Sequence, residues 1–272
     1  MLNLDIGPFA LPLAHLYLVM AIATATVVAW FAGRRRQVAV GGILTDMVLV
    51  GLLAARIGFV LMWFEVYRED WMSILDIRDG GFAAWPGLAA AIAVGAWKTR
   101  GAAAQREVLT MAVLAGAIAW FVAGGTSTAD SPAGVAMPQT ELVTVDGRPS
   151  TLATISAGKP AVVNLWATWC PPCRREMPVL ASAQQNQPGI QFIFVNVGED
   201  PATIERFLKA EQLELRNIVL DPMSALGRAV GSTALPTTLF YDAQGKLVDV
   251  HLGVLSAASL ADKMARLGEV EG

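Results

Sequence analysis

Two cysteines stand three residues apart in the segment Trp169-Cys170-Pro171-Pro172-Cys173, and they are the only cysteines in the chain. The pair follows an apolar run expected to form a buried strand and begins a stretch expected to be helical. The dipole and the free N–H groups at the start of a helix stabilise a thiolate, the reactive form of cysteine. One turn later, Cys173 is placed to attack a mixed disulfide on Cys170 and release the product. The spacing therefore predicts thiol–disulfide exchange, with Cys170 as nucleophile and Cys173 as resolving thiol.

Two other roles for the same pair are half of a zinc site and a purely structural disulfide. A zinc site needs about four ligands, and beyond the two cysteines the chain offers only His15 and His251 as nitrogen ligands. We expect His15 to be a packed or interfacial residue and His251, on an outer strand, to be solvated. Neither a metal nor another cofactor is therefore predicted.

The paired prolines bear on the redox direction. Pro171 suits the first helical position, where its missing N–H would have no partner in any case. Because Pro171 and Pro172 both lack N–H groups, Cys170 keeps mainly the N–H of Cys173 as a hydrogen-bond donor. A less stabilised thiolate makes a less oxidising pair. The prolines favour a reductant, with a disulfide oxidase or isomerase as the alternative.

The elements that position this pair alternate between strands and helices from residue 160 onward. Such alternation predicts an α/β layered domain with a partly parallel sheet. The expected strands are 161–167, 190–197, 217–220, 237–241 and 246–252, and the expected helices are 171–186, 201–212, 222–230 and 256–267.

Two motifs carry a family resemblance. The segment NLWATWCPPCRREMP at residues 164–178 and the segment ALPTT at residues 234–238 resemble the membrane-tethered thioredoxins of the TlpA/ResA/DsbE type. The resemblance covers about residues 140–268 and implies a thioredoxin-like fold. Asn164 stands where thioredoxin itself has a buried aspartate, which favours this branch.

The resemblance also implies roles for other residues. Glu176, one helical turn after Cys173, matches the family's active-site acid and is placed to exchange protons with that thiol; an exposed carboxylate near a helix start is the alternative. Pro236 matches the cis-proline that faces the dithiol and lets the backbone of Leu235 pair with an extended substrate segment, against an ordinary trans turn proline. Substrate contacts are further implied for Trp169, Pro171 and Pro172. Pro178 matches the proline that kinks the active-site helix.

The first 125 residues are dominated by apolar runs with few charges. Four runs, at about 10–32, 38–64, 82–97 and 107–124, approach the roughly 20 apolar residues that span a bilayer. A cleaved signal peptide is disfavoured, because the first run is too long and ends in Arg34-Arg35-Arg36 instead of small residues.

Positive charge beside a span stays on the cytoplasmic side of a membrane. Residues 34–36, together with Lys98, Arg100 and Arg106, therefore mark the inner face, whereas the loop between the second and third runs has mixed charge. With the N-terminus outside, four crossings return the chain to the outer side after residue 124. We predict a multi-pass protein of a bacterial inner membrane with its thioredoxin-like domain in the periplasm.

The predicted organisation has three parts. Residues 1–124 form a helical membrane domain of about four transmembrane helices, residues 125–139 a linker rich in small and turn-forming residues, and residues 140–272 the thioredoxin-like domain. The chain has no basic stripe with interleaved aromatic residues, so nucleic acid is not an expected partner.

The membrane half has a resemblance of its own. Segments 6–11 (IGPFAL), 53–61 (LAARIGFVL) and 78–82 (RDGGF) look like the N-terminal part of prolipoprotein diacylglyceryl transferases, over about residues 1–100. The chain has Trp85-Pro86-Gly87 where that family has His-Gly-Gly, and the family's later Arg- and Asn-bearing helices are absent. Arg56 is the matching charge at membrane depth and is a candidate for binding a lipid headgroup. The alternatives for Arg56 are an inherited scaffold residue and one that reaches the interface.

These observations define the expected function. Carrying reducing equivalents across a membrane by thiols needs a second cysteine pair, which this chain lacks. We therefore expect a membrane-anchored reductase of disulfides in target proteins that exchanges electrons with a separate DsbD/CcdA-like membrane partner. A lipid-binding or vestigial lipoprotein-processing module with an accessory thioredoxin domain is the alternative from another class. Apocytochrome c, copper-site proteins and oxidised sulfur enzymes fit equally well as substrates.

Overall fold

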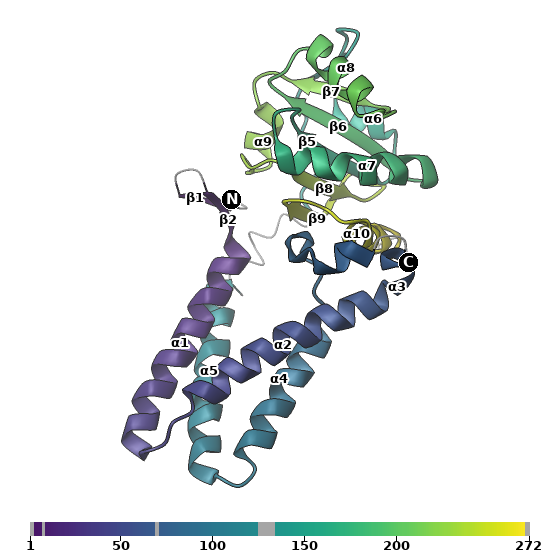
Figure 1. Cartoon of the computed structure of the whole chain (residues 1–272). Coiled ribbons are helices and arrows are strands. Elements are labelled where there is room, and N and C mark those ends of the chain that lie inside the picture. The colour runs from purple at the N-terminus through teal and green to yellow at the C-terminus, as the bar shows by residue number, and fades with distance from the viewer. Residues whose placement is uncertain (1–2, 7–8, 69–70, 125–133, 270–272) are drawn as a thin grey trace. The chain divides into compact units, whose positions relative to one another are not determined.

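A computed structural model describes residues 3–6, 9–68, 71–124 and 134–269 (Figure 1). The chain divides into two compact units. The helical unit contains residues 11–74 and 81–130, and the sheet unit contains residues 1–10, 75–80 and 131–272.

The helical unit is built from four long helices joined by short segments. Three of them, α1, α2 and α5, are long and apolar enough to cross a membrane. The fourth, α4, has 16 residues, which gives about 24 Å against a hydrocarbon core of about 30 Å. The fourth expected crossing therefore depends on a helix shorter than the bilayer core. The elements are α1 (Leu13–Arg36), α2 (Gly41–Met62), α3 (Phe64–Tyr67), η1 (Trp71–Leu75), α4 (Ala84–Thr99) and α5 (Ala103–Gly124).

Helices α2 and α4 pack against each other through small residues. A Cβ atom built on Gly87 of α4 would lie 2.8 Å from both the Cβ of Ala55 and the carbonyl oxygen of Gly51, on α2. At the far end of α4, Lys98 forms an ion pair with Asp46 near the start of α2, so the two helices are antiparallel. Small residues let helix backbones approach closely, which favours association where no hydrophobic driving force acts between helices.

Helices α1 and α5 form a second seam of the same kind. A Cβ atom on Gly116 of α5 would lie 2.9 Å from the carbonyl oxygen of Ala21 and 3.1 Å from the Cβ of Ala25. Further along, Ala29 of α1 is buried with Val108 and Ala112 of α5. Figure 1 shows the two pairs, α1 beside α5 and α2 beside α4.

The sheet unit holds a seven-stranded sheet in the order β4-β3-β7-β6-β5-β8-β9. The central strands β5, β6 and β7 are parallel, and the remaining pairings are antiparallel. The strands are β3 (Leu142–Thr144), β4 (Pro149–Ser150), β5 (Ala161–Trp166), β6 (Gln191–Val197), β7 (Ile218–Asp221), β8 (Thr237–Tyr241) and β9 (Leu247–Leu252). The helices are α6 (Leu152–Ser156), α7 (Pro171–Asn186), α8 (Pro201–Ala210), α9 (Ala225–Ala229) and α10 (Ala257–Glu269), with η2 at Ile77–Asp79.

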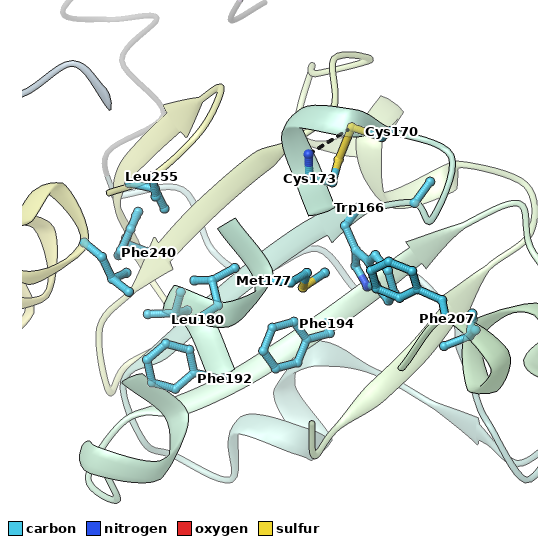
Figure 2. Packing of buried hydrophobic residues seen from close by; sticks show 14 of the residues in the cluster. Trp166, Cys170, Cys173, Met177, Leu180, Phe192, Phe194, Phe207, Phe240 and Leu255 are labelled. Carbon is cyan, nitrogen blue, oxygen red and sulfur yellow. Dashed lines mark hydrogen bonds between the residues drawn. A yellow bond between two sulfur atoms is a disulfide. The ribbon is translucent and has the colours of Figure 1, made fainter. Parts of the chain in front are cut away.

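Alternation of side chains along the strands gives the sheet two apolar faces. Phe192 and Phe194 of β6 point to the face covered by α7, α8 and α10, whereas Ile193 and Val195 point to the face covered by α6 and α9. Figure 2 shows the first face, where Met177 and Leu180 of α7 lie over the two phenylalanines. The expected α/β layers with a partly parallel sheet are therefore present.

Several elements were not expected from the sequence. The short strands β3 and β4 and the helix α6 precede the first predicted strand, and β1 (Asn3–Ile6) and β2 (Phe9–Pro12) form a separate two-stranded sheet. Within the predicted linker, the N–H of Met137 donates to the carbonyl of Gly245, and Met137 is buried. Residues 125–133 lie outside the described part of the chain.

Candidate functional site

Cys170 and Cys173 form a disulfide at the start of α7. Cys170 is the N-cap residue, and its sulfur accepts a hydrogen bond from the N–H of Cys173 at 3.3 Å. The intervening Pro171 and Pro172 have no N–H to offer. Cys170 is 4% exposed and Cys173 is fully buried. Cys170 is therefore the more accessible residue of the pair, which suits an attacking thiol, and the helical donor to its sulfur is the one that the sequence predicted.

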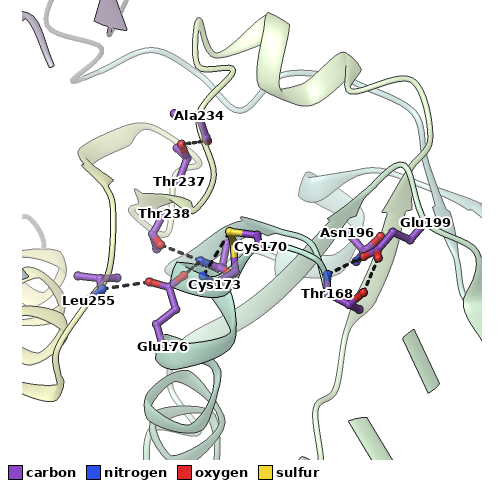
Figure 3. Close-up of a disulfide and its surroundings, with 11 residues drawn as sticks. Thr168, Cys170, Cys173, Glu176, Asn196, Glu199, Ala234, Thr237, Thr238 and Leu255 are labelled. Atoms are coloured by element: carbon purple, nitrogen blue, oxygen red, sulfur yellow. Dashed lines mark hydrogen bonds between the residues drawn. A yellow bond between two sulfur atoms is a disulfide. The ribbon is translucent and has the colours of Figure 1, made fainter. Parts of the chain in front are cut away.

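The loop before the dithiol is anchored by a glutamate that the sequence reasoning missed. The Glu199 carboxylate, just after β6, accepts hydrogen bonds from the Thr168 N–H at 2.7 Å and from the Thr168 hydroxyl at 2.5 Å. The Asn196 amide donates to the same carboxylate at 2.7 Å (Figure 3). The next residue, Trp169, is 66% exposed. A fixed loop therefore presents an exposed aromatic ring directly before the reactive cysteine.

The Leu235–Pro236 peptide bond is cis, as the family resemblance implies. Leu165 pairs with Thr237, the first residue of β8, so Pro236 directly precedes β8 and lies beside the end of β5, from which the dithiol loop leaves. The Thr237 hydroxyl lies 2.8 Å from that of Ser232 and donates to the carbonyl of Ala234 at 2.7 Å, which secures this turn. Leu235 is half-buried.

Glu176 is fully buried on the inner side of α7. One carboxylate oxygen accepts from the Asn164 amide at 2.8 Å, and the other accepts from the Leu255 N–H at 3.0 Å (Figure 3). Burial raises the pKa of Glu176 to about 7, against the opposing effect of these two donors. Since the side chain is buried, the alternative of an exposed carboxylate is excluded. An acid that titrates near neutral pH one turn from Cys173 suits proton exchange with a thiol.

A row of polar residues crosses the sheet beneath α7. Asn164 of β5 pairs in register with Thr238 of β8, and Thr238 pairs with His251 of β9. The expectation that His251 is solvated is wrong: the residue is 9% exposed, because its strand face is covered by α10, and its Nε2 lies 3.1 Å from the carbonyl oxygen of Val254. Burial, with the nearby Lys263 cation, lowers the pKa of His251 to about 4.

Helix α7 continues through Pro178. Arg56 lies in the helical unit, where its guanidinium donates to the carbonyls of Ser73, Ile74 and Gly81. The side chain of His15 and the residues Gly7 and Pro8 lie outside the described part. No group of three His, Cys, Asp or Glu side chains suited to a metal ion occurs among the described residues.

The sequence did not single out five residues that hydrogen-bond around the site: Thr168, Glu199 and Asn196 beside the dithiol loop, and Thr238 and Leu255 in the network of Asn164 and Glu176. A signal for two of them was available: Asn196 lies within an apolar strand run and Thr238 lies within a predicted strand, where a buried polar side chain needs a specific partner. Leu255 acts through its backbone, so its residue type gave no indication.

Comparison with known proteins assigns the two halves separately. The Redoxin family model matches residues 132–264, and the prolipoprotein diacylglyceryl transferase family model matches residues 2–127. The chain is 32% identical over 119 residues to the thiol-disulfide oxidoreductase ResA of Bacillus subtilis, which covers 42% of this chain and 66% of that protein. This is just under two thirds of the relative's length.

Two further relatives are matched over more of their length. ResA of Geobacillus thermodenitrificans is 35% identical over 126 residues, covering 45% of this chain and 71% of the relative. The thiol:disulfide interchange protein DsbE of Pseudomonas fluorescens is 34% identical over 136 residues, covering 48% of this chain and 73% of the relative. With its dithiol, cis-proline and buried glutamate in one sheet unit, the chain belongs to the ResA/DsbE family of thiol-disulfide oxidoreductases, joined to an N-terminal part that matches the prolipoprotein diacylglyceryl transferase family.

Proposed function

We propose that this protein is a membrane-anchored reductase of disulfides in exported proteins. The observation that supports the proposal most directly is the placement of Cys170 at the N-cap of α7, with Cys173 buried one turn later. Family membership supports thiol–disulfide exchange on protein cysteines. The reducing direction is our own inference from the two prolines.

The proposed reaction has two steps. The Cys170 thiolate attacks one sulfur of a substrate disulfide, which forms a mixed disulfide and releases one substrate thiolate. Cys173 then loses its proton to Glu176 and attacks the Cys170 sulfur, which releases the second substrate thiolate. Two electrons pass to the substrate, its two sulfurs take up two protons, and the protein is left with the Cys170–Cys173 disulfide.

The reducing direction is supported by the hydrogen bonds of the Cys170 sulfur. Strong oxidants are those whose reduced form is especially stabilised. Here the first two helical positions are prolines, and the Cys170 sulfur accepts from the N–H of Cys173. We infer that the thiolate receives limited stabilisation, so that the reduced protein gives up its electrons readily.

Trapping the thiols in growing cells tests the direction. Cells are quenched with acid, free thiols are alkylated, and the redox state of the full-length protein is read from its gel mobility. A protein that is mostly reduced supports the reductase. A protein that is mostly oxidised overturns it in favour of a disulfide oxidase or isomerase.

A substrate trap tests the roles of the two sulfurs. In Cys173→Ser the second step is blocked, so mixed disulfides with substrates should accumulate on Cys170 and disappear on reduction. The matched control is the Cys170→Ser, Cys173→Ser double variant, which should capture nothing. Capture by Cys170→Ser instead would reverse the two roles.

We further propose a separate membrane partner of the DsbD/CcdA kind as the electron source, since the chain's two cysteines are both in this pair. The proposed location is a bacterial inner membrane, with residues 1–124 as the membrane domain, 125–139 as the tether and 140–272 as the periplasmic domain. The three long apolar helices support membrane anchoring. Loss of this partner should leave the protein oxidised in cells.

A lipid-headgroup role for Arg56 is a separate proposal that rests on the resemblance of the membrane half. The engagement of its guanidinium by three backbone carbonyls supports a scaffold role instead. Comparing Arg56→Gln with Cys170→Ser distinguishes the two. If Cys170→Ser alone reproduces the deletion phenotype, a lipid role is not needed for function.

A further inference from the structure

Asn164 is an uncharged amide in the middle of a fully buried strand. It is 1% exposed, and its Nδ2 donates to the Glu176 carboxylate at 2.8 Å and to the Thr238 hydroxyl at 2.9 Å. Both N–H bonds of the amide are therefore used, on two different elements. The amide links the acid behind Cys173 to the strand that follows the cis-Pro236 turn.

The oxygen of the Asn164 side-chain amide indicates why an amide stands at this position. The Asn164 Oδ1 atom is buried and has no hydrogen-bond partner among the described residues. Leaving a buried acceptor unpaired is unfavourable, and an apolar residue here would avoid that cost. At this position both amide N–H groups are hydrogen-bonded, whereas the amide oxygen has no partner in the part of the chain that the structure describes.

The groups that face Glu176 show why the side chain at position 164 must be uncharged. From α7 the neighbour is Cys173, from β5 it is Asn164, and the Leu255 N–H comes from the segment after β9. Further along the row, His251 is neutral above about pH 4, and Lys263 pairs with Asp249 beyond it. Glu176 is thus the group that titrates near neutral pH in this row.

We propose that Asn164 is a positioning residue, whose amide holds Glu176 against the dithiol and ties it through Thr238 to the strand of the cis-proline. The inference rests on the proposed function, because it assigns Asn164 a part in the proton transfer from Cys173. A carboxylate at position 164 would place two acids within hydrogen-bond distance. Two carboxylates that share a site do not ionise together, so the pair would hold one proton near neutral pH and release it only at a higher pH.

The test follows the second step of the reaction in the full-length protein in detergent. The reduced protein is mixed with 5,5′-dithiobis(2-nitrobenzoate): Cys170 releases the first thionitrobenzoate and Cys173 releases the second. The rate of the second release is measured against pH. Without the Asn164 donor the carboxylate is less stabilised, so Asn164→Ala should raise the pH midpoint by about one unit, a tenfold change in proton affinity. Asn164→Asp should raise it further, and Thr238→Val should raise it less.

Asn196 provides the matched control. It is also fully buried on the neighbouring strand and donates its amide to a glutamate, and its Oδ1 has no partner within the described part of the chain, but its glutamate is Glu199. Asn196→Ala should keep the wild-type midpoint. A wild-type midpoint in Asn164→Ala, or an equal shift in Asn196→Ala, would overturn the proposal. If Asn164→Ala does not fold, the nearly isosteric Asn164→Asp decides by the same criterion. Failure of the wild-type protein to release the second thionitrobenzoate would instead contradict the proposed function.

Discussion

Glu176 and His251 are buried titratable groups whose pKa values are shifted in opposite directions. Burial favours the neutral form of each, which raises the pKa of Glu176 to about 7 and lowers that of His251 to about 4. In the unfolded chain these groups titrate near their ordinary values of 4.5 and 6.5. The two residues therefore make the stability of the fold depend on pH in opposite directions.

For Glu176, the raised pKa means that its contribution to stability is fully present below pH 4.5 and is lost as the pH rises through about 7. The oxidised Glu176→Gln variant should not show this loss, which amounts to about 3 kcal/mol at most. Hydrogen–deuterium exchange of β5 amides in the full-length protein, measured across that range, reports the change. An unchanged pH slope in Glu176→Gln would contradict a buried, titrating acid.

For His251, the lowered pKa has the opposite sign: its contribution is present above pH 6.5 and is lost as the pH falls through about 4. Between about 4.5 and 6.5 the two effects should nearly cancel in the wild-type protein. His251→Gln should therefore lose β5 protection as the pH rises through this window, whereas Glu176→Gln should gain it. The same slope in both variants would show that neither residue controls the effect.

The sequence predicted the helix that carries the residues proposed to react, but not the residues that support them. Cys170, Cys173 and Glu176 stand at fixed spacings on one helix, so local geometry alone brought them together. Thr238 and Leu255 reach Glu176 or its partner Asn164 only through strand register and a distant turn. His251 was misjudged because the burial of an outer strand depends on α10, which packs on it from later in the chain.

At the scale of elements, the helical unit is held by contacts that only small residues allow. Gly87 of α4 lies against Ala55 and the backbone of Gly51, and Gly116 of α5 lies against Ala21 and Ala25. Added side-chain atoms at these positions would separate the helix axes and remove van der Waals contacts along the whole seam. Glycine is required here by close approach, since these positions are helical.

Gly87→Val should therefore lower the thermal unfolding midpoint of the detergent-solubilised protein. Overpacking of this kind costs about 1–3 kcal/mol. Gly42→Val is the matched control, because a Cβ built on that helical glycine meets nothing within 4 Å. Equal midpoints for the two variants would show that the α2–α4 seam does not limit stability.

The long elements were predictable and the short ones were not. The central strands and α7 differ from their predicted ranges by at most a residue, because apolar runs, prolines and turn residues delimit them. The strands β3 and β4 have three and two residues, too few to show a periodic pattern. Helix α4 ends at Thr99, and a short turn leads from there into α5. The helix therefore stays close to the short apolar run that predicted it.

At the scale of the whole molecule, the side of the membrane on which the dithiol works depends on whether α4 crosses. If α4 crosses, the segment between α4 and α5 faces the cytoplasm, as its basic residues indicate. If it does not cross, that segment and the loop after α2 lie on the same side, and the sheet unit is placed in the cytoplasm. The length of α4 leaves both topologies to be tested, and we propose the first.

Single cysteines introduced into a Cys170→Ser, Cys173→Ser background test whether α4 crosses the membrane. Arg68→Cys, in the exposed segment after α3, should react with a membrane-impermeant maleimide in intact cells. Gly101→Cys, between α4 and α5, should react only after permeabilisation. Labelling of both positions in intact cells would contradict four crossings.

The pairing of the helices has a consequence for how the protein is made. α1 packs on α5 and α2 packs on α4, so the inner pair is enclosed in the sequence by the outer pair. During synthesis, α1 therefore lies in the membrane without its packing partner until α5 has been inserted. The α2–α4 seam can close early, whereas the α1–α5 seam closes only as the chain leading to the dithiol domain emerges. The packing of the membrane helices is thus completed by α5, the helix that directly precedes the dithiol domain in the chain.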